Sequence, residues 1–166
     1  STVLAPAVAL NDGLCIATQE GLFFLEEQGK IRKKMGLIGE CIQLVHDNHE
    51  IVFVSTNKSI VYALKNQERI WAKKMKGTIE AGPIVAGKNL YLATSEKRVY
   101  GFDFAGKRVL LESLESVPKK WGMVGNDEYL WIALKDSLLG LSLEQGKMVW
   151  KNRVKSAPSH ILVAHD

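Results

Sequence analysis

Residues 82–107 read GPIVAGKNLYLATSEKRVYGFDFAGK and contain three short apolar runs, at 84–86, 90–94 and 99–103. Each run is rich in β-branched and aromatic residues, and turn-forming residues separate the runs. This composition is typical of short β-strands. The tripeptide Gly87-Lys88-Asn89 is a tight-turn former, so the first two strands are expected to form a hairpin.

The same pattern recurs along the whole chain. The run at 90–94 returns at 14–18, 52–56 and 130–134, so successive copies lie 38, 38 and 40 residues apart. Each period of about 39 residues holds four apolar runs, and no window shows the spacing of an amphipathic helix. The repeat predicts an all-β chain of four four-stranded antiparallel blades, as in a β-propeller. A β-sandwich is the alternative, but it does not explain the near-constant spacing.

The repeat resembles that of the pyrroloquinoline-quinone-type (PQQ-like) β-propellers. The third copy matches best, with Leu90-Tyr91-Leu92-Ala93-Thr94 and Val99-Tyr100-Gly101-Phe102-Asp103, and the fourth supplies Gly146-Lys147-Met148-Val149-Trp150. In that family a Trp after the Gly docks against the neighbouring blade. Trp150 stands at this position and Trp71 close to it, but the first and third copies have Lys33 and Leu110.

The resemblance implies a ring of about six to eight blades, so four blades are expected to be part or half of a larger ring. We predict a single β-propeller segment over residues 1–166, with blades at about 3–35, 40–75, 80–114 and 120–154. Residues 157–166 resemble the opening of the first blade and would start a further one. A homodimer, or the remainder of a parent propeller, could then complete the ring.

The composition is that of an ordinary globular domain. The chain has 166 residues, 46% hydrophobic and 24% charged, a net charge of +4 and a pI of about 9.0. No stretch approaches the roughly 18 apolar residues of a membrane-spanning helix. Cys15 and Cys41 lie in apolar runs and are expected to be buried free thiols, which favours a reducing, cytoplasmic location. A periplasmic or secreted location remains open.

The residues do not indicate an enzyme. PQQ enzymes bind their quinone and a calcium ion with clustered acidic and amide residues, whereas the acids of this chain are scattered and Asp12, Asp103 and Asp127 are expected in turns. His46-Asp47-Asn48-His49 could suggest a metal, but its place between two strands favours a hairpin turn. We therefore predict no catalytic residue, no cofactor and no metal.

Basic residues concentrate on the fourth, outermost strand of the blades. Lysines on an exposed edge strand discourage aggregation, and this is the simpler explanation. The alternative is a positive surface for an acidic partner, with neighbouring apolar side chains as anchors. The candidate partner-binding residues are Lys33, Lys34, Lys73, Lys74, Lys76, Lys119, Lys120 and Trp121.

The sequence therefore favours a non-enzymatic scaffold for protein–protein interaction, a sensor or assembly domain of a larger protein. Loops at one end of the blades would bind the partner. Two alternatives are a fragment of a quinone-dependent dehydrogenase, and a module that binds anions or nucleic acid through the basic rim. The net charge of +4 makes nucleic acid the less favoured partner.

Overall fold

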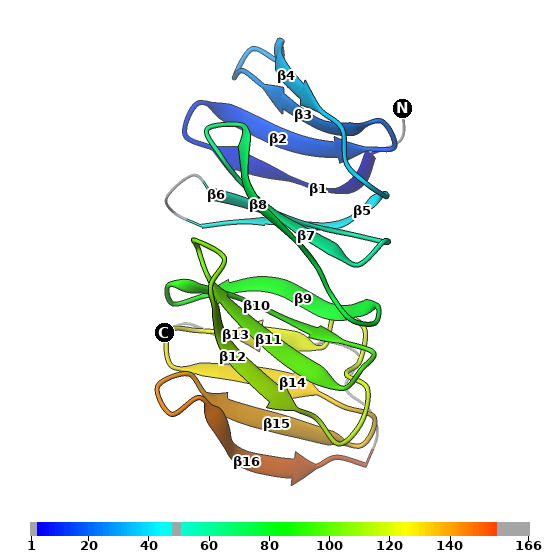
Figure 1. The fold of residues 1–166 in the computed structure, drawn as a ribbon, viewed down its shortest axis with the longest axis vertical. Coiled ribbons are helices and arrows are strands. Elements are labelled where there is room, and N and C mark those ends of the chain that lie inside the picture. The colour runs from blue at the N-terminus through cyan, green and yellow to red at the C-terminus, as the bar shows by residue number, and fades with distance from the viewer. Residues whose placement is uncertain (1–2, 48–50, 156–166) are drawn as a thin grey trace. The chain divides into compact units, whose positions relative to one another are not determined.

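The computed structural model describes residues 3–47 and 51–155, which form four antiparallel four-stranded sheets and, within these ranges, no helix (Figure 1). The prediction of an all-β chain of four blades is confirmed. The sheets comprise, in chain order, β1 (Val3–Leu10), β2 (Gly13–Thr18), β3 (Gly21–Leu25) and β4 (Ile31–Met35); β5 (Cys41–His46), β6 (Ile51–Thr56), β7 (Ile60–Lys65) and β8 (Glu68–Lys74); β9 (Ile79–Ala86), β10 (Asn89–Thr94), β11 (Arg98–Asp103) and β12 (Arg108–Ser113); β13 (Met123–Gly125), β14 (Tyr129–Ala133), β15 (Ser137–Ser142) and β16 (Lys147–Arg153).

Each sheet is a simple meander in which consecutive strands pair. The order is β1-β2-β3-β4 in the first sheet and equivalent in the other three, so the first and fourth strands are the two edges. We call these sheets blades 1 to 4. No helix among the described residues is long and apolar enough to cross a membrane.

The chain divides into two compact units, residues 1–75 and residues 76–166. Unit 1 contains blades 1 and 2, and the first strand of each, β1 and β5, lie against one another. One apolar core fills the space between the two blades, with Cys15 and Phe24 from blade 1 and Val54 and Tyr62 from blade 2. Of the two fourth strands, β4 contributes Met35, which is half-buried and packs against this core.

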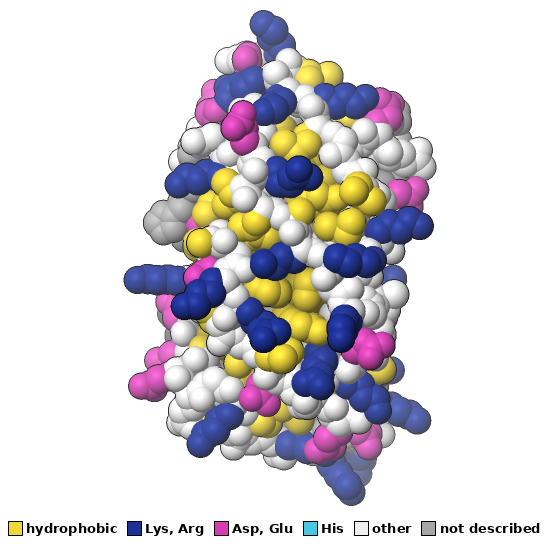
Figure 2. Space-filling view, viewed as in Figure 1, with side chains coloured by type: hydrophobic (Ala, Val, Ile, Leu, Met, Phe, Trp, Pro, Cys, Tyr) yellow, Lys and Arg dark blue, Asp and Glu magenta, His cyan; other side chains and the backbone are white. Residues whose placement is uncertain are grey.

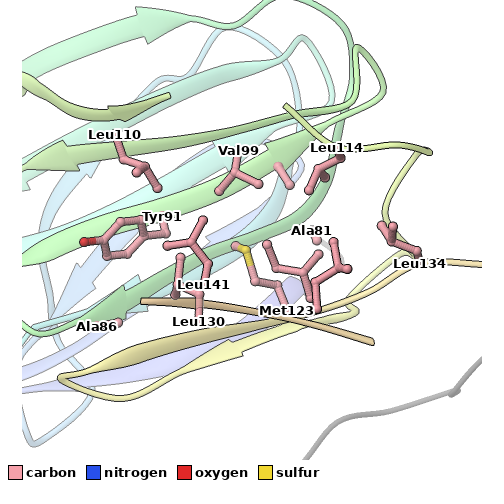
Figure 3. Close-up of a cluster of buried hydrophobic side chains, with 13 residues drawn as sticks. Ala81, Ala86, Tyr91, Val99, Leu110, Leu114, Met123, Leu130, Leu134 and Leu141 are labelled. Carbon is pink, nitrogen blue, oxygen red and sulfur yellow. The ribbon is translucent and has the colours of Figure 1, made fainter. Parts of the chain in front are cut away.

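Unit 2 contains blades 3 and 4 and repeats this arrangement, with β9 against β13. Its core joins Tyr91 and Leu110 of blade 3 to Leu130 and Leu141 of blade 4, and Met123 lies among them (Figure 3). Nearly all of these side chains are fully buried. Removal of their apolar surface from water is the main contribution to the stability of each pair of blades.

One set of paired residues crosses each blade at the same register, and we call it the central row. The central rows are Cys15–Phe24–Lys33, Phe53–Ala63–Trp71, Tyr91–Gly101–Leu110 and Trp131–Gly140–Trp150. Directly paired residues of antiparallel strands point to the same face. The adjacent row on the opposite face, here the reverse row, is Ile16–Phe23–Lys34 in blade 1, Val54–Tyr62–Ala72 in blade 2 and Ile132–Leu139–Lys151 in blade 4.

Small residues in the third strand leave room for large side chains of the neighbouring strands to lie over it. A Cβ added to Gly140 would lie 2.2 Å from the ring of Trp150, so the indole lies directly over that glycine. The equivalent residue of blade 2 is Ala63, beside which the rings of Phe53 and Trp71 lie 6.1 Å apart. The fourth-strand tryptophans of blades 2 and 4 thus lie opposite a small residue, and blade 1 has Phe24 at the equivalent position.

The outer edge strand is irregular at the same place in every blade. Pairing of the third and fourth strands shifts between Phe24 and Leu25 in blade 1 and between Gly140 and Leu141 in blade 4, and blades 2 and 3 shift at the equivalent positions. Such a bulge bends the strand and disrupts the ladder. The exposed edge is therefore protected from edge-to-edge pairing by its shape as well as by its lysines.

Candidate protein-interaction surface

Lys33 and Lys34 of β4 point to opposite faces of blade 1 because successive strand residues alternate. The Nζ of Lys33 lies 3.7 Å from a carboxylate oxygen of Glu68. The Nζ of Lys34 lies 2.6 Å from a carboxylate oxygen of Glu20 and 5.1 Å from the ring centre of Phe23. The two lysines therefore do not form one basic surface, and each has an acidic partner.

Lys73 and Lys74 of β8 alternate in the same way, opposite Val61 and Ile60. The Nζ of Lys73 lies 5.9 Å from the ring centre of Trp71, and that of Lys74 donates a hydrogen bond to the carbonyl oxygen of Lys58. These contacts hold both ammonium groups close to their own sheet. The fourth strands carry the lysines that the sequence indicated, but they spread them over two faces.

Lys76, Lys119, Lys120 and Trp121 belong to unit 2. Lys76 is exposed just before β9. The other three form part of the connection between β12 and β13, where Lys120 and Trp121 are exposed and Lys119 is half-buried. The Nζ of Lys120 lies 5.6 Å from the ring centre of Trp121, which is within the range of a cation–π contact.

The loop that carries Trp121 is held by backbone hydrogen bonds to two strands. The amide of Lys119 donates to the carbonyl of Ala133, and the amide of Ala133 donates to the carbonyl of Gly122, at 2.8 and 2.7 Å. The amide of Trp121 itself donates to the carbonyl of Glu80 at 3.1 Å. Both strands, β14 and β9, lie within unit 2, so the loop is anchored to its own core.

Trp121 is the most unusual residue of this loop. Its φ is +62°, in the left-handed region that a tryptophan rarely adopts, and 45% of it is exposed to solvent. Left-handed backbone at a residue other than glycine persists only where its surroundings enforce it. The anchored turn therefore holds a large indole outside the core. We call Val117, Lys119, Lys120 and Trp121 the Trp121 surface; Val117 is 41% exposed.

Elsewhere the surface mixes the two kinds of charge with apolar side chains. On the face shown in Figure 2, lysine and arginine side chains are scattered among hydrophobic and acidic ones. The exposed apolar residues include Ile70, Val109 and Val149, one each on β8, β12 and β16. Single exposed apolar residues are normal on a protein surface.

A groove that sequence reasoning did not find lies at the turns between β9 and β10 and between β13 and β14. Tyr91, Tyr129, Asp127, Glu128 and Glu144 line it, and it holds about 820 Å³ of empty space, part of it open to solvent. Burial raises the pKa of Tyr91, and a hydrogen bond from the side chain of Asn89 to its hydroxyl opposes this. Asp127 was expected in a turn from the sequence. All three acids belong to blade 4, and the packing of blades 3 and 4 places them beside Tyr91.

The structure describes only some of the residues that the sequence suggested for metal or redox chemistry. The amide of Ile51 donates to Oδ1 of buried Asp47 at 2.7 Å, as expected for a turn, whereas Asn48 and His49 lie outside the described residues. His160 and His165 also lie outside them. Within residues 3–47 and 51–155, no group of three potential metal ligands occurs. Cys15 and Cys41 are buried free thiols, and burial raises the pKa of each to about 12.

Comparisons with known proteins place this fold. The sequence model of the family described as outer membrane protein assembly factor BamB, a PQQ-like family, matches residues 41–112. No protein in a search of curated proteins matches the chain. BamB from Moraxella catarrhalis is 16% identical over 91% of this chain and 53% of its own, with a TM-score of 0.74.

Two further solved structures are similar. The structure of BBS1N in complex with ARL6DN, soaked with mercury, is 13% identical over 96% of this chain and 57% of that one, with a TM-score of 0.77. Apo AztD from Citrobacter koseri is 11% identical over 95% and 48%, with a TM-score of 0.74. The chain thus spans about half the length of the solved proteins it matches. Its fold is that of a β-propeller, and its residues 41–112 match the model of a PQQ-like family.

Proposed function

We propose that this chain is a non-enzymatic propeller scaffold that binds a protein partner through the Trp121 surface. The observation that carries the proposal is the exposed indole of Trp121 on a backbone turn anchored to β9 and β14. Tryptophan is enriched among the residues that dominate protein interfaces, and a preorganised side chain loses little entropy on binding. Lys119 and Lys120 beside it favour a partner with acidic groups at the rim.

The similar proteins support a role in protein assemblies. One is described as an assembly factor and another was solved in complex with a second protein. Their identities to this chain are 16% and 13%, so they support the fold, and the role comes to this chain by proposal.

The test compares proteins captured from lysates of the source cells by the immobilised wild-type chain, Trp121→Ala and Ile70→Ala. Ile70 is 46% exposed and Trp121 45%, so the control removes a similarly exposed apolar side chain elsewhere. We expect at least one protein to be retained by the wild type and Ile70→Ala and lost by Trp121→Ala. Equal retention by all three would contradict the assignment of the Trp121 surface.

The quinone-dehydrogenase alternative has its own test. Titration of the chain with pyrroloquinoline quinone in the presence of calcium should show no saturable binding. Saturable binding would contradict the non-enzymatic proposal and favour an enzyme fragment.

We also propose that residues 1–166 are one segment of a larger propeller, with blades at about 3–35, 40–75, 80–114 and 120–154. The segment at 157–166, which would begin a further blade, lies outside the described residues. The two buried free thiols support the proposed cytoplasmic location, because an oxidising compartment favours disulfides.

A further inference from the structure

Within each unit, the central row of one blade packs on the reverse row of the next. In unit 1, Cys15 and Phe24 are 0% and 2% exposed against Val54 and Tyr62, which are 0% and 3% exposed. In unit 2, Tyr91 and Leu110 share one core with Ile132 and Leu139, and none of the four exceeds 8% exposure. The same contact is therefore built twice from different residues.

Four rows have no such counterpart within their own unit among the described residues: the central rows of blades 2 and 4 and the reverse rows of blades 1 and 3, the last being Leu92–Tyr100–Leu111. In two of the four the second-strand residue is half-buried, whereas Phe53 of blade 2 and Leu92 of blade 3 are 0% exposed. One of the two half-buried rows is the reverse row of blade 1, where Ile16 and Phe23 are half-buried. The other is the central row of blade 4, where Trp131 and Trp150 are half-buried. The equivalent row residues in the two cores are almost completely buried. Each of these two rows therefore has the composition of a contact between blades, but no second blade of its own unit packs on it.

We propose that the central row of blade 4 in one copy of this chain binds the reverse row of blade 1 in a second copy. The chain itself carries both halves of the contact, an aromatic central row and an aliphatic and aromatic reverse row.

The charges at the two rows are compatible with this contact. The central row of blade 4 has no charged side chain, and Tyr129 extends it, with a ring centre 6.0 Å from that of Trp131. The reverse row of blade 1 ends in Lys34, whose ammonium already lies over an aromatic ring. Indole rings of blade 4 and the Lys34 ammonium are a favourable pair. Two such contacts in a symmetric dimer would cover both of these rows in each copy.

The test is the molar mass in solution at micromolar concentration, measured by light scattering on a sizing column. The wild type is expected at twice the chain mass of 18.5 kDa. Trp131→Glu and Ile16→Lys each place a charge in one of the two rows, and each is expected at the monomer mass. An equimolar mixture of the two variants is expected to return to the dimer mass, because one of its contacts pairs Glu with Lys and the other is wild type.

The controls separate this proposal from the Trp121 surface and from unfolding. Trp121→Ala should leave the dimer intact, because Trp121 belongs to neither row. Circular dichroism establishes that each variant folds; if Trp131→Glu does not, Ile16→Lys tests the contact from the other row. A monomeric wild type, dimers that survive both charges, or variants that stay monomeric when mixed would each overturn the proposal.

Discussion

The central rows of blades 1 and 4 occupy the same register but distribute their volume in opposite ways. Blade 1 places a small Cys15 beside a large Phe24 and ends in Lys33, whereas blade 4 places Gly140 between two tryptophans. In blade 1 the third strand itself fills the core, with Phe24 only 2% exposed. In blade 4 the outer strand folds its Trp150 back over the glycine.

Blades 2 and 3 lie between these extremes. Blade 2 has Ala63 between Phe53 and Trp71. Blade 3 has Gly101, and a Cβ added to this glycine would lie 2.6 Å from the ring of Tyr91. Each row therefore combines a small residue with larger ones, and the small residue lies in the second strand of blade 1 and in the third strand of the other blades. Close-packed interiors require this, because a void or an overlap in one strand must be compensated by its neighbour.

The largest expected effect is at Phe24. Phe24→Ala should destabilise the chain by about 3–5 kcal/mol, because no large neighbour in the central row of blade 1 can fill the cavity. Chemical denaturation followed by circular dichroism measures the change. A loss below about 1 kcal/mol would show that the core of unit 1 collapses around the site.

The second effect is a loss of stability at alkaline pH. It is caused by Cys15, which lies in the same central row as Phe24, and by Cys41. Burial raises the pKa of each thiol from 9.0 to about 12, so folding favours the protonated thiols. Their contribution to stability is complete below pH 9 and is lost as the pH rises from 9 towards 12, by about 1.4 kcal/mol per pH unit and thiol at most. Denaturation at pH 8 and pH 10 measures it.

The matched control for this pH dependence is the double variant Cys15→Ala and Cys41→Ala. The two proteins differ in no other ionisable group, so the difference in their pH dependence isolates the thiols. If both proteins lose the same stability between pH 8 and pH 10, the two thiols do not contribute.

A smaller effect is expected at Gly140. Gly140→Ala should cost about 1–3 kcal/mol, because the new Cβ overlaps the indole of Trp150, which is half-buried and must move. Adding Trp150→Leu should recover part of the loss, since the third blade pairs Gly101 with Leu110. A double-mutant cycle measures the coupling, and fully additive losses would argue against the overlap.

The smallest effect is expected at Lys33. Lys33→Ala should change stability by less than about 1 kcal/mol, because its ion pair with Glu68 is long and solvent-exposed. The effect should shrink further in high salt. A loss as large as that of Phe24→Ala would mean that the aliphatic part of Lys33 packs in the core of unit 1.

The candidate site was predictable only in part. The eight residues were singled out because basic and apolar residues stand next to each other in the sequence. Residues adjacent in a strand point to opposite faces of the sheet. Lys33 and Lys34 therefore lie on opposite faces although they are neighbours in sequence, and so do Lys73 and Lys74. In the turn, by contrast, Lys120 and Trp121 are neighbours in sequence and their side chains also lie in contact.

The sequence by itself determined the repeat, the four strands of each blade and the absence of helix from the described residues. Those features depend on local alternation, turn residues and β-propensity, which the chain carries at every copy. The left-handed backbone of Trp121, the groove beside Tyr91 and the match of central rows to reverse rows depended on the tertiary structure. They arise from contacts between residues that are far apart in the chain, such as Trp121 with Glu80, and no local pattern encodes such pairs.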